Sequence, residues 1–111
     1  NWALPFEAVA GIVRARRPGM PVALAFLEFM SPALPEAGAR LAAQGCTEVA
    51  VVPLFLGAGG HVRKDLPALL AELAAQHPQV VWSLQPAIGE IDSVVQAMAE
   101  AALRLGEPPP L

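Results

Sequence analysis

The chain has 111 residues, enough for one domain, and its 55% hydrophobic and 15% charged residues favour a buried core over disorder. A net charge of −3 argues against a nucleic-acid-binding surface, and the single Cys46 excludes an internal disulfide framework. No apolar run approaches the roughly 20 residues that a membrane span needs, because Pro53 and Gly57 interrupt the best candidate. With no signal-peptide pattern at the start, the composition predicts a soluble, cytoplasmic, single-domain protein over residues 1–111.

Helical and strand-like segments alternate along the chain. The helical segments repeat apolar residues at a spacing of three and four, whereas the strand-like segments are short and almost continuously apolar. After residue 106, the sequence EPPPL predicts a loose tail. The predicted helices cover residues 3–17, 31–45, 63–77 and 90–106, and the predicted strands cover residues 22–29, 48–56 and 79–86.

Several helix ends carry recognisable signals. The first helix is predicted to stop at Pro18–Gly19, after a last turn rich in arginine that suits the helix dipole. The second is predicted to begin with Ser31 as its N-cap and Pro32 at its first position, and to end just before Gly45. The third carries a stripe of apolar side chains for packing, namely Leu66, Leu69, Leu70 and Leu73.

Strands that are apolar on both faces and separated by helices predict a parallel sheet covered on both sides. The fold class is therefore an open, doubly wound α/β sheet of the flavodoxin-like kind. Folds of this type normally begin with a strand, whereas this chain opens on a helix. The pattern predicts that a first strand belongs ahead of Asn1.

Two chemically capable side chains follow predicted strands. Glu28 lies at the carboxyl end of the strand over residues 22–29, and His61 lies in the loop that leaves the strand over residues 48–56. Ligands of open α/β sheets bind beyond the carboxyl ends of the strands, so both residues are expected at the ligand-binding edge. A carboxylate and an imidazole there can bind a metal ion or move protons.

Each of these residues also has an alternative explanation. His61 could be a surface loop histidine, and Glu28 could be a solvated charge at a strand end. The glycines Gly57, Gly59 and Gly60 favour a functional role for His61, because they allow a large flat ligand to approach the backbone or a positive φ to form.

Arg63 and Lys64 lie where a first helical turn is predicted, an unfavourable place for cations relative to the helix dipole. They could be ordinary polar surface residues, but their position favours a role in holding carboxylates or phosphates. His77, at a helix end, is explained by capping alone, and Trp82 is interpreted as a packing residue. Phosphate-loop, dinucleotide-binding and paired-cysteine zinc motifs are absent from the sequence.

Four sequence features together resemble the small CbiX-type sirohydrochlorin chelatases of cobalamin and sirohaem synthesis. They are the strand-end AFLE, the helix start SPALPEA, the strand VVPLFL and, most specifically, GGHVRKDLP. PAIG at residues 86–89 also fits a turn of that family. The resemblance covers nearly the whole chain.

The resemblance implies a class II chelatase that inserts Co²⁺, or Fe²⁺ or Ni²⁺ in relatives, into sirohydrochlorin without ATP or a tightly bound cofactor. It implies a homodimer, with His61 handling the metal and Glu28 assisting metal delivery or proton removal. Gly59 and Gly60 would admit the macrocycle, while Arg63 and Lys64 would anchor its carboxylates. The family's opening strand ends in a second metal-site histidine, which corresponds to a position before residue 1.

Two other functions stay open on the residues alone. One is a metal- or tetrapyrrole-binding module that carries its ligand without catalysis, and the other is a plain α/β interaction domain. The glycines, the histidine and the basic pair together on the ligand-binding edge make the plain interaction domain the least favoured of the three functions.

Overall fold

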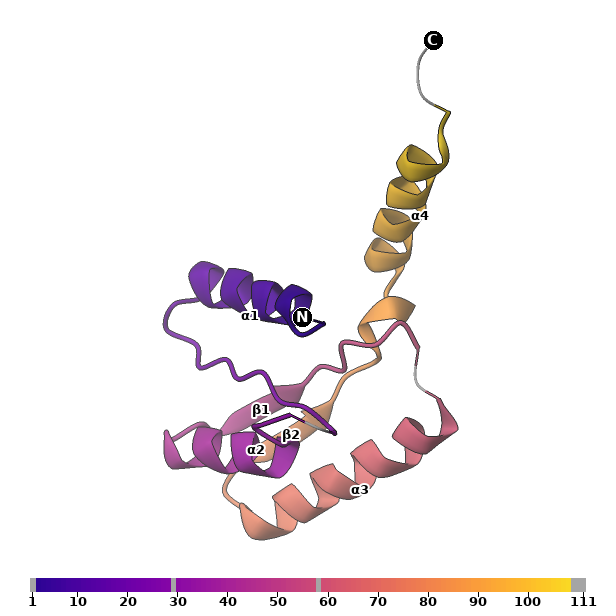
Figure 1. The fold of residues 1–111 in the computed structure, drawn as a ribbon. Coiled ribbons are helices and arrows are strands. Elements are labelled where there is room, and N and C mark those ends of the chain that lie inside the picture. The colour runs from indigo at the N-terminus through magenta and orange to yellow at the C-terminus, as the bar shows by residue number, and fades with distance from the viewer. Residues whose placement is uncertain (1, 29, 58, 109–111) are drawn as a thin grey trace.

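The structure is a computed structural model that describes residues 2–28, 30–57 and 59–108, with the side chain of His61 outside this description. Helices and parallel strands alternate in it, which confirms the predicted α/β class (Figure 1). The elements in chain order are α1 (Leu4–Arg16), α2 (Leu34–Ala43), β1 (Glu48–Val51), α3 (Gly60–Gln76), β2 (Val81–Leu84), the 3₁₀ helix η1 (Ile88–Glu90) and α4 (Asp92–Gly106).

The sheet consists of β1 and β2, which pair in parallel with Val49 opposite Trp82. Both strands are four residues long, shorter than predicted. The ladder ends where the Gln85 N–H donates to the Val51 carbonyl at 2.9 Å. Pro53 and Pro86 follow on the two strands, and neither has an N–H with which to continue the ladder.

Over its described residues 22–28, the predicted strand 22–29 forms only an isolated bridge, in which Phe26 pairs with Ala33, and Phe29 lies outside the described residues. An apolar segment becomes a strand only beside a hydrogen-bonding partner, and the described residues place none along it. The segment contacts α1 at one end and, at the other, Trp2, which lies just ahead of α1. Arg14 Nε and Nη2 donate to the Val22 carbonyl oxygen at 3.2 and 3.0 Å. The Trp2 ring packs edge-on against the Phe26 ring, with 5.8 Å between the two ring centroids.

A cavity of about 660 Å³ lies among α1, α2 and this extended segment. Leu24 and Phe26 line it from the segment, Ala10 from α1 and Leu41 from α2. The expectation of a further strand ahead of Asn1 stays a prediction.

The predicted start of α2 is wrong. The helix begins at Leu34 with Ala33 as its N-cap, so Ser31 does not cap it, and Pro35 rather than Pro32 lies in the first turn. Its predicted end is confirmed, because Gly45 has a φ of +90°. The Gly45 N–H donates to the Ala42 carbonyl at 3.0 Å and the Cys46 N–H to the Leu41 carbonyl at 3.2 Å, the pattern of a Schellman C-cap.

The core lies where α2 and α3 pack on one face of the sheet. Leu73 is the largest fully buried side chain, and Leu66 and Leu70 of the predicted stripe are buried beside it. Gly38 lets α2 approach closely, since a Cβ there would lie 2.8 Å from Leu73 Cδ2 and 3.2 Å from the Trp82 ring. The helices and the strand can approach closely because a glycine on α2 faces the large side chains of Leu73 and Trp82.

The turn after β2 crosses the backbone that continues from β1. The Ile88 N–H donates to the Pro53 carbonyl and the Gly89 N–H to the Phe55 carbonyl, both at 2.9 Å. Gly89 is buried, and a Cβ on it would collide with the backbone of Leu56. Only glycine therefore permits this crossing, which we call the Gly89 crossing.

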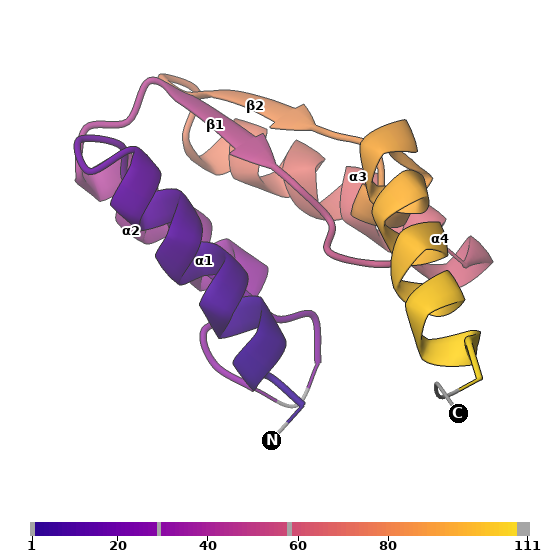
Figure 2. The ribbon, with the colours of Figure 1, turned by 90° about the horizontal axis from the view of Figure 1, so that it is seen from above.

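Helix α4 leaves the crossing and projects away from the sheet, as Figures 1 and 2 both show. The radius of gyration of 16.6 Å exceeds the roughly 13 Å of a compact domain of this length. No helix within the described ranges is long and apolar enough to cross a membrane.

Replacing Gly89 by alanine should destabilise the protein, because the added Cβ displaces the backbone at Leu56. We expect a loss of about 1–3 kcal/mol in the free energy of unfolding, measured by urea denaturation. Gly11→Ala is the matched control, since open space surrounds Gly11 within α1, and a gain of about 0.5–1 kcal/mol is expected there. Equal stability of the two variants would contradict the close approach at Gly89.

Candidate functional site

The candidate site lies beyond the carboxyl ends of β1 and β2. Three segments meet there: residues 53–57, which continue from β1, the first turns of α3, and η1 with the turn before it. The Gly89 crossing joins the first of these to the third. This is the edge at which open α/β sheets bind ligands, as the sequence predicts.

His61 is the second residue of α3, not a loop residue as predicted, because the helix begins at Gly60. Its side chain lies outside the described residues. Gly59 precedes the helix with φ −70° and ψ 165°, an ordinary extended conformation. Among the described residues Gly45 alone is a glycine with positive φ, so the prediction of positive φ in this loop is wrong.

The structure agrees with the other role predicted for these glycines, which is to leave room for a ligand beside the backbone. Apart from the adjoining backbone and chain neighbours, no atom of the described residues lies within 4 Å of a Cβ built on Gly57, Gly59 or Gly60. All three are exposed. A flat molecule could therefore approach this backbone without meeting any side chain that the structure describes.

The start of α3 is electropositive. The helix has no acidic residue in its first turn and no side-chain cap, so its first N–H groups keep their donor capacity. Arg63 and Lys64, both exposed, add two cations to the positive end of the helix dipole. This arrangement costs some helix stability, and it suits an anionic ligand.

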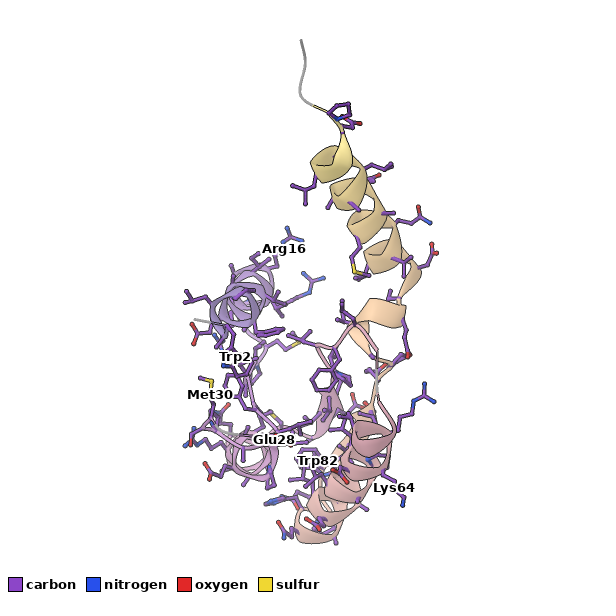
Figure 3. All side chains as sticks on the ribbon, turned by 45° about the vertical axis from the view of Figure 1, so that its right-hand side comes forward. Trp2, Arg16, Glu28, Met30, Lys64 and Trp82 are labelled. Atoms are coloured by element: carbon purple, nitrogen blue, oxygen red, sulfur yellow. The ribbon has the colours of Figure 1, made fainter. Side chains whose placement is uncertain are left out.

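The two cations differ in what they face. Arg63 lines a cavity of about 220 Å³ between α3 and the turn after β2. Lys64 is not among the residues that line it, and Figure 3 shows its side chain pointing outward from α3. Arg63 therefore lines a concave surface, whereas the Lys64 ammonium is on open surface.

The residues that line this cavity are mostly apolar. Gln85 and Glu90 contribute polar groups beside Arg63, and Gln85 Nε2 also donates to Ser83 Oγ at 3.3 Å. Neither residue was singled out from the sequence, although Gln85 directly follows β2 and so lies at the ligand-binding edge. The full lining is Pro53, Val62, Arg63, Leu66, Pro67, Leu84, Gln85, Pro86, Ala87 and Glu90.

Glu28 is exposed and is not among the residues that line this cavity. Figure 3 shows it on the same side of the molecule as Trp2 and Met30, with Lys64 on the other side. Within the described part of the chain, no three His, Cys, Asp or Glu side chains are grouped closely enough to hold a metal ion. The structure thus places Arg63 at a cavity close to the glycine segment (Gly57, Gly59 and Gly60), whereas Glu28 does not line that cavity.

His77 and Trp82 have structural roles, as predicted. His77 is the C-cap of α3 and its N–H donates to the Leu73 carbonyl at 2.8 Å. Its ring lies 6.1 Å from that of Trp82, whose Nε1 donates to the His77 carbonyl at 3.5 Å. The second histidine of the chain is therefore remote from the start of α3, at the other end of the same helix.

Comparison with known proteins identifies the family. A model of the CbiX family matches residues 1–105. A sirohydrochlorin ferrochelatase of Bacillus subtilis is 32% identical over 85 residues, which are 77% of this chain and 33% of the relative. A sirohydrochlorin cobaltochelatase of Methanosarcina acetivorans is 36% identical over 63 residues, which are 57% of this chain and 48% of the relative. The chain thus spans about half or less of the length of these relatives.

Solved structures agree with the sequence matches. A crystal structure of a cobalamin (vitamin B12) biosynthesis CbiX protein from Marinobacter aquaeolei VT8 is similar with a TM-score of 0.77 and 32% identity. That match covers 94% of this chain and 84% of the other. SirB from Bacillus subtilis with Fe³⁺ is similar with a TM-score of 0.74 and 30% identity, over 92% of this chain and 40% of the other.

The exposed site residues should be replaceable without loss of fold. Glu28→Gln and Lys64→Ala are each expected to change the free energy of unfolding by no more than about 0.5 kcal/mol, since both side chains are exposed. Thermal denaturation followed by circular dichroism measures this. A loss of more than about 2 kcal/mol in either variant would mean that the side chain supports the fold.

Proposed function

Because the chain belongs to the CbiX family, we propose that it inserts a divalent metal ion, Co²⁺ in the first instance, into the tetrapyrrole sirohydrochlorin. The names of the relatives support metal insertion into this macrocycle, with cobalt for one and iron for another. The proposed reaction is that of a lyase in cobalamin or sirohaem synthesis, carried out in the cytoplasm by a homodimer. No tightly bound cofactor is required, since metal and macrocycle are both substrates.

One observation carries this proposal beyond family membership: the electropositive, uncapped start of α3 directly after an open glycine segment. Sirohydrochlorin is flat and bears several carboxylates. A flat ring needs open backbone to approach, and carboxylates need N–H donors and cations. The start of α3 offers all of these within residues 57–64.

His61 is the proposed metal-handling residue. An imidazole is a good ligand for the borderline divalent ions cobalt, iron and nickel, and it can release them to the four ring nitrogens. Metal insertion also removes two protons from the pyrrole nitrogens, so one M²⁺ enters as two H⁺ leave. A base must accept those protons, and the proposed acceptors are His61 and Glu28.

Arg63 and the glycines have a positioning role in the proposal. The guanidinium of Arg63, which is one of the residues lining the cavity, can bind one carboxylate of the macrocycle in two parallel hydrogen bonds. Gly59 and Gly60 leave room for the ring beside it. Lys64 adds a cation at the same helix end and can meet a second carboxylate.

Removal of the imidazole should abolish most of the catalysis. We expect His61→Ala to lower the rate above the spontaneous reaction by at least about 100-fold, because it removes both a ligand and a proton acceptor. The measurement follows the change in macrocycle absorbance when protein, sirohydrochlorin and Co²⁺ are mixed.

His77→Ala is the matched control, since the chain has two histidines and His77 caps the opposite end of α3. Full activity of His61→Ala would contradict the proposed role. If the unsubstituted chain binds the metallated product tightly without accelerating its formation, a non-catalytic binding module is the better description.

Loss of the cations should weaken substrate binding more than it slows the chemical step. Arg63→Ala is expected to raise the KM for sirohydrochlorin by about 10-fold or more, because it removes both charge-assisted hydrogen bonds to the carboxylate, with a smaller effect for Lys64→Ala. Arg16→Ala, an exposed cation near the end of α1, is the matched control and should leave KM unchanged. An unchanged KM in Arg63→Ala would contradict the proposed role of Arg63 in binding a carboxylate of the substrate.

A further inference from the structure

Three aromatic side chains form a cluster where α1 begins, which we call the Trp2 cluster. The ring centroids of Trp2 and Phe6 lie 5.9 Å apart, and those of Trp2 and Phe26 lie 5.8 Å apart. The ring planes make angles of 74° and 85°, so both contacts are edge-to-face. Phe6 comes from α1 and Phe26 from the segment over residues 22–28, so two separate parts of the chain hold the indole.

The indole keeps much of its surface open. Trp2 is 60% exposed, whereas Trp82, the other tryptophan, is half-buried. An indole with a ring packed over each of its two faces could not be this exposed, so at least one face of Trp2 is open among the described residues. Leu4 and Leu27, close along the chain to Trp2 and Phe26, are 57% and 38% exposed. Apolar side chains exposed close together mark ligand or partner sites more often than single ones do.

The Trp2 cluster lies toward the ligand-binding edge of the fold. Helix α1 runs antiparallel to β1 in both ribbon views, so its first turn lies toward the carboxyl end of β1 (Figures 1 and 2). Phe26, which contacts Trp2, precedes Glu28 by two residues, and Figure 3 shows Trp2 and Glu28 on the same side of the molecule. The open indole and the proposed proton acceptor Glu28 therefore share one side of this edge.

The open indole supplies what the rest of the candidate site lacks. The glycine segment leaves room for a flat ring, and the cavity lined by Arg63 offers a guanidinium and other polar groups, but none of the lining residues is aromatic. Sirohydrochlorin carries its carboxylates at its periphery, while its conjugated ring is flat and apolar. Cations suit the periphery and an exposed aromatic face suits the ring, because stacked π systems attract and lose apolar contact with water together.

We propose that the open face of Trp2 stacks on the macrocycle of the substrate and holds the ring beside Glu28. The inference rests on the proposed function, because it concerns the substrate of that reaction. Edge-on contacts with Phe6 and Phe26 fix the plane of the indole in advance, so less side-chain freedom is lost when the macrocycle binds. Trp2 is thereby a substrate-binding residue, distinct from the cations that meet the carboxylates.

Binding of metal-free sirohydrochlorin to the 111-residue chain, measured by isothermal titration calorimetry, tests this contact. Trp2→Leu keeps an apolar side chain but loses the flat ring, and it should raise the Kd about 10-fold, within the range typical of ring stacking. Trp2→Phe keeps an aromatic ring and should raise the Kd by no more than about 3-fold. Ile12→Ala is the control, since it removes another exposed apolar side chain from α1, and it should leave the Kd unchanged.

Nuclear magnetic resonance tests the stacking directly, because the chain has two tryptophans and hence two indole N–H signals. The ring current of a stacked macrocycle should shift the Trp2 signal. The Trp82 signal should stay in place, since that ring is half-buried and its Nε1 donates to the His77 carbonyl.

Three results would overturn the stacking contact. They are an unchanged Kd in Trp2→Leu, an equal loss in Trp2→Leu and Trp2→Phe, and an unshifted Trp2 signal in the saturated complex. A Trp2 signal that shifts with protein concentration alone would also overturn it, since another copy of the chain would then cover the indole. Binding with the expected Trp2 effects but without acceleration of metal insertion would overturn the proposed function and support the stacking contact. An unsubstituted chain that binds no macrocycle would overturn both.

Discussion

The Gly89 crossing is the contact on which the functional edge of this fold depends. Two hydrogen bonds hold the turn after β2 against the backbone that continues from β1, and glycine at residue 89 is what allows the backbones to approach. The sheet itself is only two four-residue strands, a small base for a ligand site. The crossing holds the two backbones together for several residues beyond the last hydrogen bond of the ladder, up to the start of the glycine segment.

Three features of the molecule follow from this constraint. The glycine segment and the start of α3 are held beside the turn after β2, which forms the cavity lined by Arg63. The cations at the start of α3 oppose the helix dipole, an unfavourable arrangement that an anionic ligand would relieve. Finally, η1 is fixed in an orientation that directs α4 away from its own sheet, so the chain exposes apolar surface on both elements.

Predictions from the sequence succeeded where short-range spacing decides the structure. Leu66, Leu70 and Leu73 of the predicted α3 stripe are buried, because residues three and four apart share a helix face. Gly45 ends α2 because a positive φ suits glycine. The predicted start of α2 failed for a different reason. Ser31 and Pro32 look like a helix start, but the Phe26 N–H donates to the Pro32 carbonyl at 2.9 Å and holds those residues outside the helix. A contact across the chain overrode the local signal there.

The sequence by itself determined the approximate positions of the four helices and of the two paired strands, the parallel α/β class and the edge at which the glycines, His61 and Arg63 gather. Each of these depends on apolar periodicity or on residues adjacent in the chain. The tertiary structure alone decided that residues 22–26 are extended without a strand partner, that α3 begins at Gly60, that Arg63 and not Lys64 faces a cavity, and that α4 projects outward. These outcomes depend on which distant backbone and side chains supply hydrogen bonds and contact surface, and no local pattern specifies those partners.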